Sequence, residues 1–160
     1  MKSVFYYEYP IGPVGIIEEE GAISGVFFRN RKNSWALDAA LAETSLIKKT
    51  AVQLRDYFNG KRKVFDIPLL LRGTGFQAAV WNVLRTIPYG ETRTYKNIAA
   101  LAGNPKACRA AGMANNRNPV VIIIPCHRVI GGDGSLTGYG GGLEVKQYLL
   151  ELEGSLPPAT

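Results

Sequence analysis

The sequence of 160 residues is poor in side chains that bind metals, since it has only two cysteines and one histidine. No pair of them has metal-ligand spacing, and they are too few for a four-ligand zinc site without carboxylates, so we expect no metal. Long apolar runs are also missing. The longest aliphatic run, residues 120–124, is far shorter than the ~20 residues of a membrane helix, and no secretory signal follows Met1. We therefore expect no membrane association, a cytoplasmic location and reduced cysteines.

The positive charge of the chain is concentrated in its middle. With 46% hydrophobic, 10% aromatic and 20% charged residues, the composition is that of an ordinary globular protein. Its 19 basic and 13 acidic residues give a net charge of +6, and residues 75–128 alone hold seven bases against one acid. Such a concentration favours a polyanionic partner such as DNA. A solvated basic surface without a partner is the alternative.

The patterning predicts an α+β protein with two domains. Three β-branched and aromatic segments separated by turn residues predict a short antiparallel sheet: residues 4–9, 14–18 and 22–28. Ile47, Ala51, Leu54 and Phe58 recur at helical spacing, and Asn59-Gly60 ends that helix. We expect residues 1–73 to form a small scaffold domain of antiparallel sheet and helix. It is expected to pack on a mainly helical domain, residues 74–160, that contains a helix-turn-helix.

The helix-turn-helix is predicted between residues 94 and 116. Thr94 can cap a helix over residues 95–101, Ala102-Gly103 form the turn, and Asn104-Pro105 can begin the second helix. That second helix carries alanines on one face and a basic and polar set on another: Lys106, Arg109, Met113 and Asn116. A closely supported helix with such an outward face suits a DNA groove, whereas a plain helical hairpin in a bundle is the alternative.

The only histidine follows Cys126 directly, in Pro125-Cys126-His127-Arg128. Prolines flank the aliphatic run before it, so we expect residues 120–124 to be extended and buried. A neighbouring imidazole can favour the reactive thiolate, while an inert buried cysteine beside a core histidine is the alternative. Between Gly131 and Gly142, seven of twelve residues are glycine, which predicts a loop that could enclose a ligand.

The last predicted helix buries a stripe of Val145, Tyr148, Leu149 and Leu152 and ends at Glu153 before Gly154. A carboxylate there opposes the negative end of the helix dipole. A residue that breaks such a charge preference without an obvious gain in stability often belongs to a functional site. Glu153 is therefore a candidate to orient His127, as in catalytic triads, and an exposed terminal glutamate is the alternative.

From about residue 76 to 154 the chain resembles the O6-alkylguanine-DNA alkyltransferases in a single register. The resemblance rests on Tyr95, Asn104-Pro105-Lys106-Ala107-Cys108-Arg109, Asn118-Pro119 and Ile124-Pro125-Cys126-His127-Arg128-Val129. It implies a DNA repair protein that flips a damaged base and transfers the alkyl group from O6 of guanine irreversibly to its own cysteine. Such a methylated-DNA-[protein]-cysteine S-methyltransferase turns over once and needs no cofactor.

The resemblance also implies a role for each matching residue. Cys126 would be the nucleophile, His127 its base through a water, and Glu153 the group that holds the imidazole. Asn118 would hold the cysteine segment, and Tyr95 would donate a proton toward the leaving guanine. Arg109 would fill the gap left by the flipped base, and Val129, Tyr139 and Gly140 would surround that base. The full set implied to bind substrate or DNA is Arg109, Val129, Tyr139, Gly140, Lys106, Lys96 and Asn104.

The implied partner is double-stranded DNA containing O6-alkylguanine, bound by a monomer at the nucleoid of a bacterium or archaeon, or in the nucleus of a eukaryote. Two departures stand out: Gly140 replaces a serine of some relatives, and the ligands of an amino-terminal zinc site are absent. Two other functions are weighed. A module that binds alkylated bases without repair would lack the cysteine, and a helix-turn-helix regulator would bind undamaged DNA sequence-specifically. We read Cys108 as a packing residue.

Overall fold

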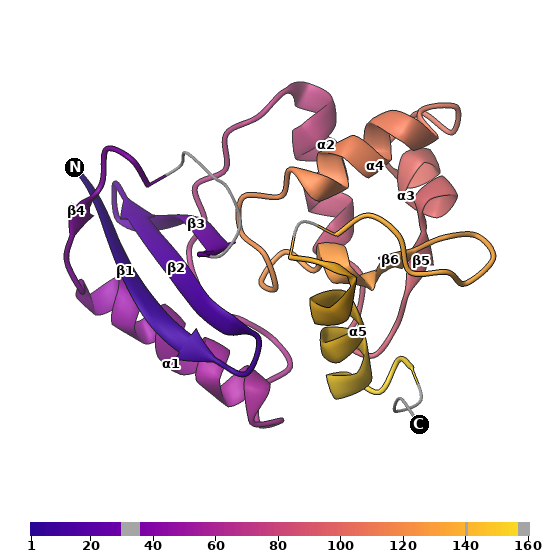
Figure 1. Ribbon diagram of the computed structural model, residues 1–160. Coiled ribbons are helices and arrows are strands. Elements are labelled where there is room, and N and C mark those ends of the chain that lie inside the picture. Colours follow the sequence, from indigo (N-terminus) through magenta and orange to yellow (C-terminus); the bar gives the residue numbers. More distant parts are fainter. Residues whose placement is uncertain (30–35, 140, 157–160) are drawn as a thin grey trace. The chain divides into compact units, whose positions relative to one another are not determined.

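The computed structural model describes residues 1–29, 36–139 and 141–156, which divide into two compact units (Figure 1). The first unit comprises residues 1–71 together with 119–121, and the second comprises residues 72–118 and the chain from Ile122 onward. Residues 119–121 thus belong to the first unit, although they lie far beyond the expected domain boundary at residue 73. The chain enters the second unit, returns briefly to the first and leaves it again just before the cysteine segment.

The first unit is a small sheet with one long helix, as predicted, and the sheet has a fourth strand that the sequence did not predict. The sheet has the order β3-β2-β1-β4, in which β1, β2 and β3 are antiparallel and β4 is parallel to β1. Its elements are β1 (Lys2–Tyr9), β2 (Gly12–Glu19), β3 (Ala22–Phe28), β4 (Ala40–Leu41) and α1 (Ser45–Phe58). Glu20 and Gly21, with φ of 54° and 77°, join β2 to β3 in a two-residue turn. Thr44 caps α1 by accepting a hydrogen bond from the Ile47 N–H at 3.1 Å.

Residues 119–121 continue the sheet of the first unit beyond β3. Val26 donates its N–H to the Pro119 carbonyl at 3.0 Å and accepts from the Val121 N–H at 3.1 Å, and it forms a parallel bridge with Val120. Val26 and Val120 are both fully buried. Tertiary pairing therefore fixes this short segment, which has too few residues to form a strand alone.

The second unit consists of helices around a two-stranded parallel pair. Its elements are α2 (Gly75–Leu84), β5 (Arg93–Thr94), α3 (Tyr95–Leu101), α4 (Cys108–Asn116), the 3₁₀ turn η1 (Cys126–Arg128), β6 (Val129–Ile130) and α5 (Leu143–Leu152). Thr74 and Gln77 form the predicted capping box of α2, and Thr94 forms another with Asn97 at the start of α3. The Trp81 indole donates to the Ala114 carbonyl at 2.9 Å and so ties α2 to α4.

The pair α3 and α4 is joined by the predicted turn, with Gly103 at φ 97°. The start of α4 was predicted too early. Asn104 does not cap the helix but accepts from the Lys106 N–H within the turn at 3.2 Å, and α4 begins at Cys108 without a side-chain cap. The expected alanine face is also narrower, since Ala111 and Ala114 are buried whereas Ala110 is exposed.

Candidate active site

The segment that leads to Cys126 pairs with β3 through residues 120 and 121 but then turns at Ile122, so it is not the continuous extended run expected from its flanking prolines. Ile122 has φ 72°, a left-handed conformation that is unusual for a β-branched residue. The reason lies at the ends of the loop, where the Asn118 side-chain amide donates to the Ile124 carbonyl at 2.6 Å. An extended chain would separate these residues by about 20 Å at ~3.3 Å per residue. The buried amide therefore forces the turn.

Cys126 is presented by two tight turns in succession. Pro125, at φ −81° and ψ 64°, forms an inverse γ-turn in which the Cys126 N–H donates to the Ile124 carbonyl at 2.8 Å. The 3₁₀ turn η1 follows and contains Cys126, His127 and Arg128, all buried. The backbone thus bends at the cysteine, so Cys126 and His127 are not held in the extended conformation that points neighbouring side chains to opposite sides.

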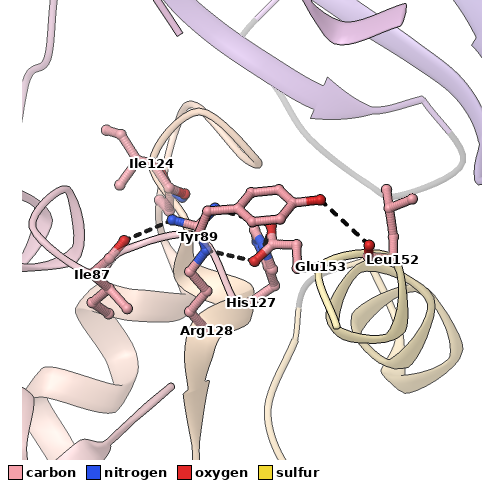
Figure 2. Close-up of polar contacts among 8 residues, drawn as sticks. Ile87, Tyr89, Ile124, His127, Arg128, Leu152 and Glu153 are labelled. Carbon is pink, nitrogen blue, oxygen red and sulfur yellow. Dashed lines mark hydrogen bonds and ion pairs between the residues drawn. The ribbon is translucent and has the colours of Figure 1, made fainter. Parts of the chain in front are cut away.

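Glu153, at the end of α5, is the centre of a buried ionic network (Figure 2). One carboxylate oxygen lies 2.7 Å from His127 Nε2 and accepts from Arg128 Nη2 at 3.0 Å. The other accepts from Arg128 Nε at 2.7 Å, so the guanidinium binds Glu153 with two parallel hydrogen bonds. Arg128 also donates to the Ile87 carbonyl at 2.7 Å. The side chains of His127 and Glu153 are fully buried.

The network fixes the protonation states of its members. Burial alone would raise the pKa of Glu153, but the hydrogen bonds from His127 and Arg128 and the charge of Arg128 prevail and lower it to about 2. Burial lowers the pKa of His127 below its usual value, against the opposing effect of Glu153. A neutral imidazole beside an ionised carboxylate must donate from Nε2. The lone pair is then on Nδ1, which is buried and has no hydrogen-bond partner among the described residues.

Cys126 is held as a thiol until a base acts on it. Only 3% of the residue is exposed. Burial raises the pKa of its thiol to about 11, and a hydrogen bond from Asn118 and the charge of Lys146 oppose this effect. Because the thiolate is the nucleophilic form, a buried base with a vacant lone pair next to this cysteine is chemically significant.

Asn115 and Lys146 are two site residues that the sequence reasoning missed. Asn115, buried on α4, donates its side-chain amide to the Cys126 carbonyl at 3.3 Å. Lys146 is fully buried on α5, whereas Tyr148, expected in the buried stripe, is 37% exposed. Both residues lie at i, i+3, i+4 spacing from apolar residues on the buried face of their helix. A polar residue at such a position was the signal in the sequence that could have identified them as site residues.

Tyr95 and Lys146 converge on one carbonyl of the glycine-rich loop. The Tyr95 hydroxyl and the Lys146 ammonium each donate to the Thr137 carbonyl at 2.8 Å. The ammonium also lies 5.8 Å from the centre of the Tyr95 ring. Tyr95 borders an open pocket of about 320 Å³, whose other lining residues are Cys108, Arg109, Gly112, Asn116, Thr137 and Gly138. Cys108 lines this pocket and is exposed, so it is not the packing residue that we expected.

The remaining predicted residues lie on the surface or beside the site. Lys96, Asn104, Lys106 and Arg109 are exposed on or between α3 and α4. Val129 is buried in β6, where it pairs with Arg93 of β5. Tyr139 interacts with the Cys126 thiol, and Gly140 lies outside the described residues.

Comparison with known proteins agrees with this geometry. Residues 75–155 match the family model described as the DNA binding domain of 6-O-methylguanine DNA methyltransferase, and residues 4–71 match its ribonuclease-like domain. The methylated-DNA–protein-cysteine methyltransferase of Methanosarcina acetivorans is 50% identical over 150 residues, which cover 93% of this chain and 96% of that protein. This chain belongs to the methylated-DNA–protein-cysteine methyltransferase family. The constitutive enzyme of Bacillus subtilis is 44% identical over 153 residues, covering 91% and 92% of the two chains.

Solved structures of this methyltransferase family have the same fold. The Mycobacterium tuberculosis O6-methylguanine methyltransferase matches with a TM-score of 0.89 and 43% identity over 100% of this chain and 97% of that one. OGT of the same organism in complex with DNA matches with a TM-score of 0.88 and 44% identity over 96% and 93%. The α+β fold, with a small sheet unit followed by a helical unit, is thereby confirmed. The methyltransferase described here is a DNA repair protein with a DNA-binding domain, and it transfers a methyl group from DNA to a cysteine of its own.

No helix in the ranges 1–29, 36–139 and 141–156 is long and apolar enough to cross a membrane.

Proposed function

We propose that Cys126 is the acceptor, that the substrate is O6-alkylguanine in double-stranded DNA, and that each molecule reacts once. The observation that carries the assignment is the buried Nδ1 lone pair of His127, fixed by the bond from Nε2–H to Glu153. The other cysteine, Cys108, is exposed, and the single histidine of the sequence is the one that follows Cys126. Of the two thiols, Cys126 is therefore the one built for activation.

The transfer balances without a cofactor. His127 Nδ1 accepts the thiol proton through a water, and the Cys126 sulfur attacks the alkyl carbon. A carbon–sulfur bond forms, the carbon–O6 bond breaks, and its electron pair stays on the guanine, which takes a proton from Tyr95. The product is a thioether, which water does not hydrolyse, so the protein is not regenerated.

Proton donation by Tyr95 requires an exchange of hydrogen bonds. Its hydroxyl donates to the Thr137 carbonyl, and burial raises its pKa. A guanine in the adjoining pocket would have to take the place of that carbonyl as acceptor. Because a neutral phenol is the form that donates, the raised pKa suits this role.

The second unit supplies the expected DNA surface. Arg109 on α4 lines the pocket and is exposed, so it can enter the space left by a nucleotide rotated out of the helix. Extrusion costs a few kcal/mol, and an inserted side chain offsets part of the lost stacking. Lys96, Asn104 and Lys106 would bind the backbone on either side. We assign DNA binding and alkyl transfer to residues 74–160 and a scaffolding role to residues 1–73. The protein would act as a monomer on chromosomal DNA in the cytoplasm.

A labelled oligonucleotide tests the proposal. Incubation with duplex DNA carrying labelled O6-methylguanine should move one label to each wild-type molecule, at Cys126 by peptide mapping. Cys126→Ala should take up none, and Cys108→Ala should still be labelled at Cys126. Label on Cys126→Ala would refute the assignment, and binding of damaged DNA without label transfer by the wild type would favour a recognition module.

A further inference from the structure

The outer edge of β1 is covered by a neighbouring strand only near its start. β4 pairs with β1 at Ser3 and Val4, and the Val4 carbonyl accepts from the Ala42 N–H at 3.0 Å. In an antiparallel pair, alternate residues turn both main-chain groups away from the partner strand. Because Val4 turns away from β2 in this manner, Tyr6 and Glu8 do so too. Within the part of the chain that the structure describes, no hydrogen bond reaches their outward N–H and C=O groups, so the edge is open there.

A groove of about 330 Å³ adjoins this open edge, between the end of β1 and helix α1, which lie side by side (Figure 1). Tyr9, in its lining, stacks on Phe58 with ring centres 5.1 Å apart and donates its hydroxyl to the Ala51 carbonyl of α1 at 2.9 Å. Side chains alternate along a strand, so Glu8 points to the face of the sheet opposite α1. An aromatic and aliphatic groove thus adjoins main-chain groups that can bind another strand.

The helix side of the groove has two cations without an acidic partner. Lys48 and Arg55 are exposed, and neither forms an ion pair with any of the described residues. They are seven positions apart on α1, which is about 10.5 Å at ~1.5 Å per residue, and Val52 lies between them. Glu43, which also lines the groove, accepts a hydrogen bond from the hydroxyl of a β1 tyrosine at 2.6 Å. The two free cations therefore favour a partner with negative charge.

We propose that the open edge of β1 and the adjoining groove bind an extended acidic segment of another protein. Its main chain would continue the sheet beyond β1, an apolar side chain would fill the groove, and acidic side chains would lie beside Lys48 and Arg55. Acidic residues four positions apart on a strand, with the apolar residue midway, span about 13 Å at ~3.3 Å per residue. The long side chains of Lys48 and Arg55 can adjust to that spacing. In such strand addition, main-chain bonds supply affinity and alternate side chains supply specificity.

An extended peptide is favoured over other occupants because it uses the edge, the groove and the cations together. A nucleotide could stack in the groove and bind the cations, but it would leave the main-chain groups of Tyr6 and Glu8 unused. A second copy could pair through its own β1, yet that strand has the sequence KSVFYYEY with a single acid, Glu8. The site lies within the first unit and is separate from the proposed alkyl transfer.

The probe is a short fluorescein-labelled peptide with capped ends. Its central leucine has a glutamate two positions away on each side, and threonine fills the other positions. Fluorescence polarisation should show saturable binding that weakens as salt is added. The double variant Lys48→Glu with Arg55→Glu should bind at least about tenfold more weakly, because two attractions become repulsions. Lys49→Glu, on the same helix but outside the groove lining, is the matched control and should bind like the wild type. Circular dichroism confirms that each variant is folded.

Methylation of peptide nitrogens separates strand addition from simple attraction of charges. Alternate N–H groups of an added strand face β1, so N-methylation of one alternate set should abolish binding, whereas N-methylation of the other set should preserve it. Hydrogen exchange at the Tyr6 and Glu8 amides, followed by NMR, should slow when the peptide is bound.

Three results with the peptide would each overturn the proposal: no saturable binding, equal losses for the two methylated peptides, or unchanged exchange at Tyr6 and Glu8. Self-association of the protein that protects the same two amides would instead assign the edge to a second copy. Binding of a single-stranded oligonucleotide that competes with the peptide and is lost in the double variant would assign the groove to nucleic acid. Either of these results would also overturn the proposal.

Discussion

Replacing Glu153 with Gln should destabilise the second unit strongly, because one carboxylate neutralises and positions two buried partners. Arg128 contributes three N–H donors, of which two bind Glu153 at 2.7 and 3.0 Å, and His127 Nε2 lies 2.7 Å from the same carboxylate. The amide of Gln can accept from one partner but carries no charge. The Arg128 guanidinium, whose side chain is 7% exposed, would then have no counter-ion.

The loss of stability in Glu153→Gln should be about 3 kcal/mol or more. The pKa of Glu153 falls from a usual 4.5 to about 2, and this difference corresponds to about 3 kcal/mol of stability at neutral pH. Independently, removal of one partner from a buried ion pair costs about 3 to 5 kcal/mol. Against a total stability of about 5 to 15 kcal/mol, a loss of this size should shift the urea midpoint well outside experimental error.

The assay is urea unfolding at neutral pH of the wild type, Glu153→Gln, Arg128→Met and the double variant. The double variant should lose about 1 to 3 kcal/mol less than the sum of the single losses, since the second change removes a group already unpaired. Glu151→Gln, on the same helix, serves as the control and should stay within about 0.5 kcal/mol of the wild type.

The acid branch of the stability curve provides a second measurement. A carboxylate whose folded pKa is depressed contributes stability that is present above its unfolded pKa of 4.5 and is lost as the pH falls toward about 2. The wild type should therefore lose about 3 kcal/mol more than Glu153→Gln over this interval. Strict additivity in the double variant together with an unchanged acid branch would refute the reasoning.

Three further substitutions test other parts of the chain. Asn118→Ala removes the donor at 2.6 Å from the Ile124 carbonyl, so it should lower the free energy of unfolding in urea by about 1 to 3 kcal/mol and slow single-turnover methyl transfer. Unchanged stability would contradict the closed-loop interpretation. Arg109→Ala should slow methyl transfer from duplex DNA at least about tenfold, but should slow transfer from a single-stranded oligonucleotide less, because no stacked base must be extruded there. Equal losses of rate on the two substrates would argue against insertion of Arg109 into the DNA. Glu20→Asn should raise the free energy of unfolding by about 0.5 to 1 kcal/mol, because Asn adopts a φ of 54° at a lower cost than Glu. A decrease in the urea midpoint would show that the contacts of Glu20 outweigh its backbone strain.

The parts of the fold that the sequence predicted correctly are those encoded within a few residues. Thr74 with Gln77 closes a capping box over three positions, and the turn at Gly103 requires a positive φ that glycine adopts freely. The three long strands follow from alternating β-branched and aromatic residues between turn signals. Such local signals place an element with little reference to the rest of the chain.

The errors have non-local causes. The turn at Ile122 depends on a bond between Asn118 and Ile124, and the brief return of residues 119–121 to the first unit depends on pairing with Val26. Nothing in the preference of a Val-Ile run for extended backbone reveals either contact. The start of α4 at Cys108 has no side-chain cap, so no capping residue in the sequence could predict where this helix begins.

The site itself was predicted from its uncommon residue types but not from its charges. The single histidine and Glu153 drew attention, whereas Arg128 and Lys146 were given no role of their own, because charged residues are seldom buried. The structure shows that both lie in the interior.

Arg128 also explains why a carboxylate is tolerated at the end of α5. A carboxylate at the carboxyl end of α5 faces the negative end of the helix dipole, which costs about 0.3 to 1 kcal/mol. A bidentate guanidinium offsets this cost and keeps Glu153 ionised, and an ionised Glu153 forces the Nε2–H tautomer of His127. Stability and reactivity are therefore coupled through one carboxylate. Arg128→Met should separate them partly, because it leaves the bond between His127 and Glu153 in place while removing the cation that keeps the acid charged.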